Sequence, residues 1–319
     1  MSDSNLKTPD LSVTIAGVLF KNPVIAASGT FGYGSEYASV FDVSRLGGIC
    51  SKGLTLEPRS GNGGIRLQET PSGLINSIGL ENPGIPAFIS EKLTGMMQLG
   101  SVIIANLSGS CQEDYAEGAR LLDRTAVDMI ELNISCPNVK AGGMAFGLDP
   151  AAAGAITAEI RKQTAKPLIV KLSPNAPDLS AVALAVTKAG ADCLSLVNTF
   201  QAIAIDTETA RPVFKNITAG LSGPGIKPIA LRMVWDTAKA MRTLPEAERI
   251  PIIGLGGIAC WQDAVEFIFA GASAVQVGTA GFANPLAMME IIDGLESFML
   301  RKGYHSVAEL CGKALDSVY

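Results

Sequence analysis

Eight short apolar segments, each followed by a stretch with helical character, recur between residues 23 and 302. They are rich in Val, Ile and Leu and lack regular polar alternation, which is typical of parallel strands packed inside a helix-covered barrel. The strand candidates are 23–28, 47–52, 101–107, 127–133, 167–172, 192–198, 250–256 and 272–278. The helix candidates are 35–46, 86–99, 111–124, 150–165, 177–189, 227–244, 260–270 and 284–302. Eight such units in 319 residues predict an α/β fold, a (β/α)8 TIM barrel.

Segments outside these eight strand and helix units add two features to the predicted barrel. The stretch "LSVTIAGVLFK" reads as two short strands around Gly17, which predicts an N-terminal β-hairpin. Three connections that follow strands are long and rich in Gly, Asn, Ser and Pro: 53–85, 134–149 and 199–226. We expect these long βα loops to cover the C-terminal face, where a barrel carries its active site. Because no linker separates a second domain, residues 1–319 are predicted to form a single domain.

Composition and charge exclude several classes of function. A net charge of -5, with scattered Lys and Arg, leaves no broad basic surface for nucleic acid. No apolar run approaches the roughly 20 residues of a membrane-spanning helix, and the N-terminus has no apolar signal core, so we expect a soluble cytoplasmic protein without membrane contact. Six cysteines without a CxxC pair predict no zinc, iron-sulfur or other metal site in this chain. The single histidine, His305, excludes a Ser-His-Asp triad.

Polar residues stand at the ends of the first six predicted strands. In strand order they are Ser28, Lys52, Asn106, Asn133, Lys171 and Asn198. Any one of them could be structural, since Asn caps turns and a strand-end Lys reaches to water. Six in register indicate a ligand site, and amides suit either a flavin's pyrimidine edge or a pyrimidine substrate. A lysine beside flavin N1 and the C2 carbonyl would stabilise the charge of reduction, and Lys171 is the candidate.

Glycines follow the last two predicted strands. The sequences are "GLGGI" at 254–258 and "VGTA" at 277–280. Glycine lets backbone N–H groups approach an anion closely, and loops after strands seven and eight are the usual phosphate site of this fold. The pattern predicts a phosphorylated ligand.

Motifs along nearly the whole chain resemble the dihydroorotate dehydrogenase family. They are "SKGLT" (51–55), "NSIGLENPG" (76–84), "ANLSG" (105–109), "ELNISCPN" (131–138), "VKLSPN" (170–175), "LVNTF" (196–200), "GLSGPGIKP" (220–228) and "GLGGI". The resemblance implies an FMN-dependent oxidoreductase that converts (S)-dihydroorotate to orotate in UMP biosynthesis.

The loop after the fourth strand implies a subclass. Cys136 stands where the family's soluble class 1 enzymes have a cysteine base and class 2 enzymes have serine. The continuation "NVKAGGMAFGLDP" resembles class 1B, although Met144 replaces the usual Gln. Class 1B implies a catalytic FMN subunit whose electrons pass to NAD through a separate subunit carrying FAD and [2Fe-2S]. It also implies a homodimer that becomes a heterotetramer with that subunit.

The resemblance also implies which residues contact the ligands. For FMN they are Ala27, Ser28, Gly29, Lys52, Asn106, Asn133, Lys171, Val197, Ser222, Gly223, Gly256, Gly257, Gly278 and Thr279. For the substrate they are Lys52, Asn76, Gly79, Leu80, Asn133, Asn138, Asn198 and Thr199.

The implied reaction removes a proton from C5 of dihydroorotate and a hydride from C6. Cys136 is the expected base for the proton and FMN N5 the expected hydride acceptor. A thiol with an ordinary pKa of about 8.5 is partly ionised near neutral pH. Residues 134–149, with their glycines, are expected to form a lid. A buried inert thiol is the alternative for Cys136, and it is the preferred reading for Cys50, Cys193 and Cys260.

Other functions remain open from the sequence. A fumarate-linked class 1A enzyme and a dihydropyrimidine dehydrogenase-like flavin barrel acting on a free pyrimidine are the nearest alternatives. Two alternatives belong to other classes of function. One is a phosphate-binding, aldolase-like barrel with Lys171 as a Schiff-base lysine, and the other is a flavin store without catalysis.

Overall fold

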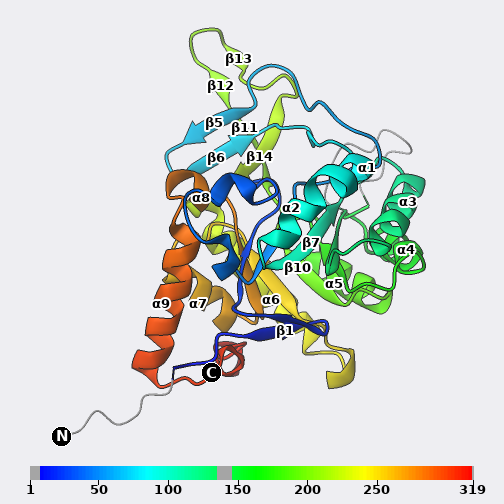
Figure 1. The fold of residues 1–319 in the computed structure, drawn as a ribbon. Helices are drawn as coiled ribbons and strands as arrows, with labels where there is room; N and C mark the ends of the chain where they lie inside the picture. Colours follow the sequence, from blue (N-terminus) through cyan, green and yellow to red (C-terminus); the bar gives the residue numbers. More distant parts are fainter. Residues whose placement is uncertain (1–7, 135–145, 318–319) are drawn as a thin grey trace, which may run out of the picture.

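The computed structural model describes residues 8–134 and 146–317 and contains a closed barrel of eight parallel strands (Figure 1). The strands are β3 (Val24–Ala26), β4 (Gly48–Cys50), β7 (Val102–Leu107), β8 (Met129–Asn133), β9 (Leu168–Lys171), β10 (Cys193–Leu196), β15 (Ile252–Leu255) and β16 (Ala274–Val277). Each pairs with the barrel strand before it in the chain, and β16 closes the ring on β3. All eight predicted strands and the predicted (β/α)8 fold are confirmed.

Helices surround the barrel. The longer ones are α3 (Gln112–Asp123), α4 (Pro150–Arg161), α5 (Leu179–Lys188), α6 (Lys227–Met241), α7 (Trp261–Phe269) and α9 (Ala287–Lys302). The predicted helix at 86–99 consists of α1 (Ile85–Ala87), a π-helical turn (Phe88–Lys92) and α2 (Leu93–Gln98), while α8 (Ala280–Ala283) is an added short helix. Short 3-10 helices occur at Ser35–Tyr37, Val43–Arg45, Pro224–Ile226, Glu246–Glu248, Val307–Glu309 and Leu315–Ser317.

The helix predicted at 35–46 is wrong, because only two 3-10 turns form there. The first follows Gly34, whose φ of 93° is left-handed and which offers no side-chain cap. At Asp42 the backbone is extended, and its carboxylate accepts a hydrogen bond from the backbone N–H of Ser44. Asp and Ser bond to nearby backbone in this way in competition with helix, so the segment turns twice instead.

The predicted N-terminal hairpin is confirmed and lies under the N-terminal end of the barrel (Figure 1). Its strands are β1 (Val13–Ile15) and β2 (Val18–Phe20). The turn residues Ala16 and Gly17 both have positive φ, 48° and 82°, as a two-residue hairpin turn requires. Ile15 and Phe20 are fully buried against the lowest inward-facing residues of the barrel, such as Ile25 and Ile169. The hairpin therefore closes one end of the barrel.

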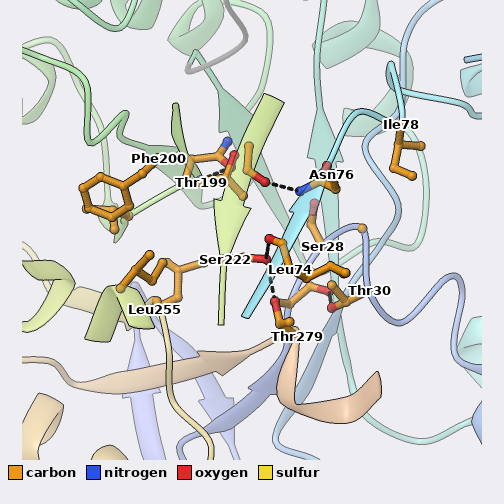
Figure 2. Close-up of a pocket in the computed structure, with 18 of the residues that line it drawn as sticks. Ser28, Thr30, Leu74, Asn76, Ile78, Thr199, Phe200, Ser222, Leu255 and Thr279 are labelled. Carbon is orange, nitrogen blue, oxygen red and sulfur yellow. Dashed lines mark hydrogen bonds between the residues drawn. The ribbon is translucent and has the colours of Figure 1, made fainter. Parts of the chain in front are cut away.

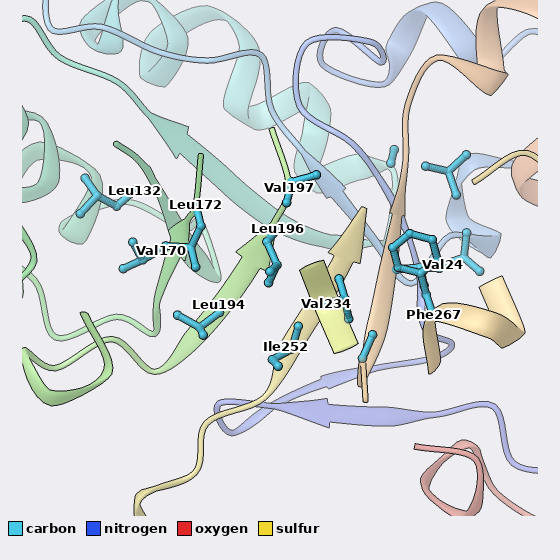
Figure 3. Packing of buried hydrophobic residues seen from close by; sticks show 14 of the residues in the cluster. Val24, Leu132, Val170, Leu172, Leu194, Leu196, Val197, Val234, Ile252 and Phe267 are labelled. Carbon is cyan, nitrogen blue, oxygen red and sulfur yellow. The ribbon is translucent and has the colours of Figure 1, made fainter. Parts of the chain in front are cut away.

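Alternate residues of the barrel strands face outward and pack against the helices. Val170, Leu194 and Ile252 on the strands lie in one buried cluster with Val234 of α6 and Phe267 of α7 (Figure 3). The burial of both faces explains why the strands read as continuous apolar runs.

A second sheet, which we call the cover sheet, lies over the C-terminal end of the barrel (Figure 1). Its strands are β5 (Leu67–Thr70), β6 (Gly73–Asn76), β11 (Phe200–Ile203) and β14 (Thr218–Ser222), in the antiparallel order β11-β14-β6-β5. A further pair, β12 (Ile205–Asp206) and β13 (Arg211–Pro212), extends beyond it. The sheet is built from the long connections 53–85 and 199–226, which were expected to cover this face as loops. In the described part of the chain, no helix has the length and apolar character needed to cross a membrane.

Replacing Phe20 by Ala tests the role of the hairpin. Phe20 is fully buried, and a Cβ added to Gly48 would lie only 2.9 Å from its ring, so the ring fills a close-packed space. We expect Phe20→Ala to lower the free energy of unfolding in urea by about 3–5 kcal/mol. Leu19→Ala on the same strand is the control, because Leu19 is 65% exposed and should lose less than about 0.5 kcal/mol. Equal losses would contradict the packing described.

Candidate functional site

A cavity of about 820 Å³ opens at the C-terminal end of the barrel. Strand ends and the loops after them line one part of it, and residues of the cover sheet, such as Leu74 and Phe200, line another (Figure 2). Its volume falls within the roughly 300–1,000 Å³ of small-molecule sites, so it can hold a mononucleotide cofactor and a small substrate.

The cavity brings together the residues that were predicted to form the site. All of the expected FMN contacts line it: Ala27, Ser28, Gly29, Lys52, Asn106, Asn133, Lys171, Val197, Ser222, Gly223, Gly256, Gly257, Gly278 and Thr279. Among the expected substrate contacts, Asn76, Gly79, Leu80, Asn198 and Thr199 also line it. The remaining two predicted residues, Cys136 and Asn138, lie outside the described residues, as does most of the predicted lid.

One end of the cavity is a glycine-rich cradle next to the cover sheet. The Thr279 hydroxyl donates to Ser222 Oγ at 2.8 Å, which joins the loop after β16 to β14 (Figure 2). Gly257 has a φ of 80°, and a Cβ there would lie 2.7 Å from the backbone nitrogen of Lys227. Only glycine fits that backbone, because any larger residue would clash with the start of α6. Backbone N–H groups and hydroxyls in such a cradle suit a phosphate group.

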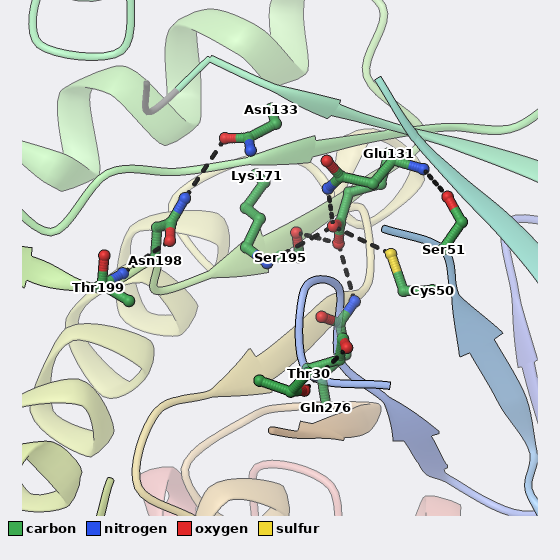
Figure 4. A network of polar contacts seen from close by, with 12 residues as sticks. Thr30, Cys50, Ser51, Glu131, Asn133, Lys171, Ser195, Asn198, Thr199 and Gln276 are labelled. Atoms are coloured by element: carbon green, nitrogen blue, oxygen red, sulfur yellow. Dashed lines mark hydrogen bonds and ion pairs between the residues drawn. The ribbon is translucent and has the colours of Figure 1, made fainter. Parts of the chain in front are cut away.

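Beneath the cavity, the carboxylate of Glu131 is fully buried inside the barrel (Figure 4). Asn106 Nδ2 and Cys50 Sγ donate to its Oε1 at 2.6 and 3.2 Å. Ser195 Oγ and Gln276 Nε2 donate to its Oε2 at 2.8 Å each.

Lys171 completes this cluster as an ion pair. Its Nζ lies 3.6 Å from Glu131 Oε1, and its side chain is 5% exposed. Burial by itself would raise the pKa of the Glu131 carboxyl, but the Lys171 ammonium and the hydrogen bonds from Gln276, Ser195 and Asn106 lower that pKa below its ordinary value. Glu131 is therefore ionised at neutral pH.

Two buried amide oxygens at the cavity find no partner within the described part of the chain. They are Asn106 Oδ1 and Gln276 Oε1, and both residues line the cavity. Because a buried acceptor without a partner is costly, a ligand with an N–H group would satisfy one of them. The N3–H of a flavin's pyrimidine ring is such a group, so these residues fit FMN.

Asparagine side chains connect β8 and β10 above the Glu131 cluster. Asn198 Nδ2 donates to Asn133 Oδ1 at 3.4 Å, and Asn198 Oδ1 accepts from the backbone N–H of Thr199 at 2.7 Å (Figure 4). On the cover sheet, Asn76 Nδ2 donates to the carbonyl of Gly220 at 3.1 Å. Barrel and cover thus both present amides to the cavity, as a ligand with carbonyl and N–H groups needs.

Lys52 is a second lysine that lines the cavity. No carboxylate in the described ranges forms an ion pair with it, although the Glu81 charge acts on it from further away. Burial lowers the pKa of its ammonium from the ordinary value of 10.5. A partly buried cation without a close counter-ion suits an anionic group of a ligand, such as a carboxylate.

The sequence analysis missed Glu131 and Gln276. Both lie in the middle of apolar segments, where the pattern predicts a strand but gives no sign of a functional side chain. The available signal was their position: Glu131 is two residues before Asn133 and Gln276 is two residues before Gly278, so each shares the inward face of its strand. Two of the cysteines behave as predicted: Cys50 and Cys193 are buried in strands, where burial raises the pKa of each thiol far above its ordinary value. The prediction of a buried thiol is wrong for Cys260, which opens α7 and is exposed.

Comparison with known proteins agrees with this arrangement. The family model for dihydroorotate dehydrogenase matches residues 10–299. A protein of Petrotoga mobilis, named dihydroorotate dehydrogenase B (NAD(+)), catalytic subunit, is 54% identical over 303 residues, which are 95% of this chain and 99% of the relative. Proteins of the same name from Caldicellulosiruptor saccharolyticus and Geotalea daltonii are each 51% identical, over 95% of this chain and 98% of their own lengths.

Neutralising Lys52 should stabilise the ligand-free protein. The folded state holds the Lys52 proton less tightly than the unfolded state, so burial of the charge costs stability at every pH below the folded pKa. We expect Lys52→Met to raise the free energy of unfolding at pH 7 by about 0.5–2 kcal/mol, as is common for substitutions at functional sites. The gain should shrink as the pH rises from the lowered folded pKa through 10.5, because the wild-type amine is neutral in both states only above that pH.

Urea unfolding between pH 7 and 10.5 measures this difference. Lys215→Met is the control, because Lys215 is exposed and its replacement should change stability little at any pH. A loss of stability in Lys52→Met at pH 7 would contradict the electrostatic account.

Proposed function

The chain belongs to the dihydroorotate dehydrogenase family, and we propose that it acts as the catalytic subunit of an NAD-linked dihydroorotate dehydrogenase. Its reaction is the oxidation of (S)-dihydroorotate to orotate, a step of UMP biosynthesis. The observation that carries the proposal is the cavity at the barrel mouth, where a glycine cradle, unsatisfied amide acceptors and two lysines meet. The names of relatives that share about half of their residues with this chain support the same activity.

FMN is proposed to occupy the inner part of the cavity. Ser222, Gly223, Gly256, Gly257, Gly278 and Thr279 would hold its phosphate. The floor of the cavity consists of the side chains gathered around Glu131. Asn106 and Lys171 on this floor would contact the pyrimidine edge of the flavin, since they offer an acceptor and a cation there. When bound, FMN supplies a hydride acceptor at N5, which no side chain of the chain can provide.

Dihydroorotate is proposed to bind between the floor and the cover sheet. The Lys52 ammonium would bind its carboxylate, because this partly buried cation lacks a close counter-ion within the described residues. The amides of Asn76, Asn133 and Asn198 would hold the ring carbonyl and N–H groups. The hydrogen bonds from Asn198 to Asn133 and from Asn76 to the Gly220 carbonyl limit rotation, so the amides are oriented before the substrate arrives.

Cys136 is the proposed base for the C5 proton. The proposal comes from the "SCPN" motif after β8, since Cys136 lies outside the described residues. Two other candidate bases are eliminated. His305 is exposed and does not line the cavity, and the Glu131 carboxylate is already held by four hydrogen bonds and Lys171. Negative charge on the substrate carbonyl would be stabilised by the amide donors and Lys52.

The electrons are proposed to leave through a separate subunit that carries FAD and [2Fe-2S]. The relatives are named as catalytic subunits of NAD(+) enzymes, which supports a separate subunit for electron transfer. Two copies of the chain and two such subunits would form the assembly.

Replacing Cys136 by Ala tests the base. We expect Cys136→Ala to keep the yellow colour of bound FMN but to slow flavin reduction by dihydroorotate by roughly 10²–10⁴, the usual contribution of a general base. Anaerobic stopped-flow absorbance measures this rate, and Cys260→Ala, at an exposed helix N-terminus, is the control. Unchanged reduction in Cys136→Ala would remove the residue from the mechanism.

The electron acceptor can be tested with the purified chain. Loaded with FMN, it should be reduced readily by dihydroorotate but should pass electrons to NAD more than an order of magnitude more slowly than the complex with its electron-transfer subunit. The comparison of NADH formation with and without that subunit, co-purified from the native source, provides the measurement. Rapid NAD reduction by the chain alone would contradict the subunit arrangement.

A further inference from the structure

We propose that Glu131 is a positioning residue of the flavin site: its buried carboxylate holds the Lys171 ammonium and orients the amides of Asn106 and Gln276 beneath the cavity. The inference rests on the proposed binding of FMN. Glu131 itself is not among the residues that line the cavity, whereas Lys171, Asn106 and Gln276 all are. Glu131 would therefore act on the ligand through these three side chains (Figure 4).

Orientation of the amides follows from the chemistry of a carboxylate. An ionised carboxylate only accepts hydrogen bonds, so the side chains that contact Glu131 must turn their N–H groups toward it. Asn106 Nδ2 and Gln276 Nε2 lie 2.6 and 2.8 Å from its two oxygens. Their carbonyl oxygens point away from the carboxylate, and these are the two acceptors left without a partner among the described residues. Glu131 thus decides that Asn106 and Gln276 turn their carbonyl oxygens, rather than their N–H groups, away from it.

Charge is the second property that Glu131 sets. Of the described charged side chains, Lys171 is the one that forms an ion pair with it, so the two formal charges of the floor cancel. Lys171 lines the cavity and Glu131 does not, so the positive charge of the pair lies on the residue nearer the ligand. Loss of the carboxylate would leave a net positive charge, which binds an electron-rich ligand more tightly.

A glutamine at position 131 would change both properties. It removes the negative charge, so FMN-loaded Glu131→Gln should bind reduced FMN at least tenfold more tightly relative to oxidised FMN than wild type does. For a two-electron couple a factor of ten raises the midpoint potential by about 30 mV. The glutamine also brings an N–H group that faces Asn106 or Gln276, so one of these amides must turn over and lose its acceptor.

The test is the midpoint potential of bound FMN, measured against a reference dye at pH 7. Glu131→Gln should raise it as stated, and Glu131→Gln/Lys171→Met, which also removes the positive charge, should abolish that rise. Asp192→Asn is the matched control, because this carboxylate also holds a cation, Arg161, but lies at the N-terminal start of β10. An unchanged potential in Glu131→Gln, or an undiminished shift in the double variant, would overturn the proposal.

A second measurement needs no variant and remains decisive even if Glu131→Gln does not fold. Wild-type apoprotein is titrated with FMN and with FMN methylated at N3, which cannot donate to an amide oxygen. We expect the methylated cofactor to bind at least tenfold more weakly, and equal affinity would overturn the assigned amide orientation. Wild-type protein that binds no FMN would overturn the proposed function itself, which is a different outcome from an FMN-loaded variant whose potential does not move.

Discussion

The alternation of side chains along a β-strand is the constraint on which the rest of this structure depends. In a closed barrel, one set of alternate residues must face the helices and the other must face the interior. The outward set is apolar throughout and forms the main core with the helices. The inward set changes along the strands: it is apolar near the hairpin, where Ile25, Ile169 and Ile253 pack, and polar nearer the mouth, where Glu131 and Gln276 lie. Alternation thus separates the outer core from the barrel interior, and position along the strand separates the apolar base from the polar residues near the mouth.

The polar floor is organised around one charge. A carboxylate inside a barrel has no water to solvate it, so neighbouring strands must supply donors. Donors come from β4, β7, β10 and β16, and β9 supplies the ammonium. Each of these bonds fixes a side chain in one orientation, and three of the five donor residues also line the cavity. The interior that stabilises the charge is therefore also the surface that a ligand meets.

The cover sheet completes the site from the other side. Its strands come from connections that are far apart in the sequence, and Asn76 on β6 reaches the backbone of Gly220 on β14. The Ser222 to Thr279 hydrogen bond then joins this sheet to the barrel at the glycine cradle. Because rigid barrel strands and a hydrogen-bonded sheet face each other, the amides between them are held in place before a substrate binds.

The sequence by itself determined the barrel, the hairpin, the family and the residues gathered at the mouth. These follow from local periodicity and from motifs with fixed spacing, which need no knowledge of distant contacts. It failed at residues 35–46, where side-chain bonds to nearby backbone outweighed helical spacing. Only the tertiary structure decided that the long connections form a sheet, and that Glu131 faces Lys171, Asn106 and Gln276. Such pairings depend on how the barrel closes, and closure brings together strands whose residues lie more than a hundred positions apart.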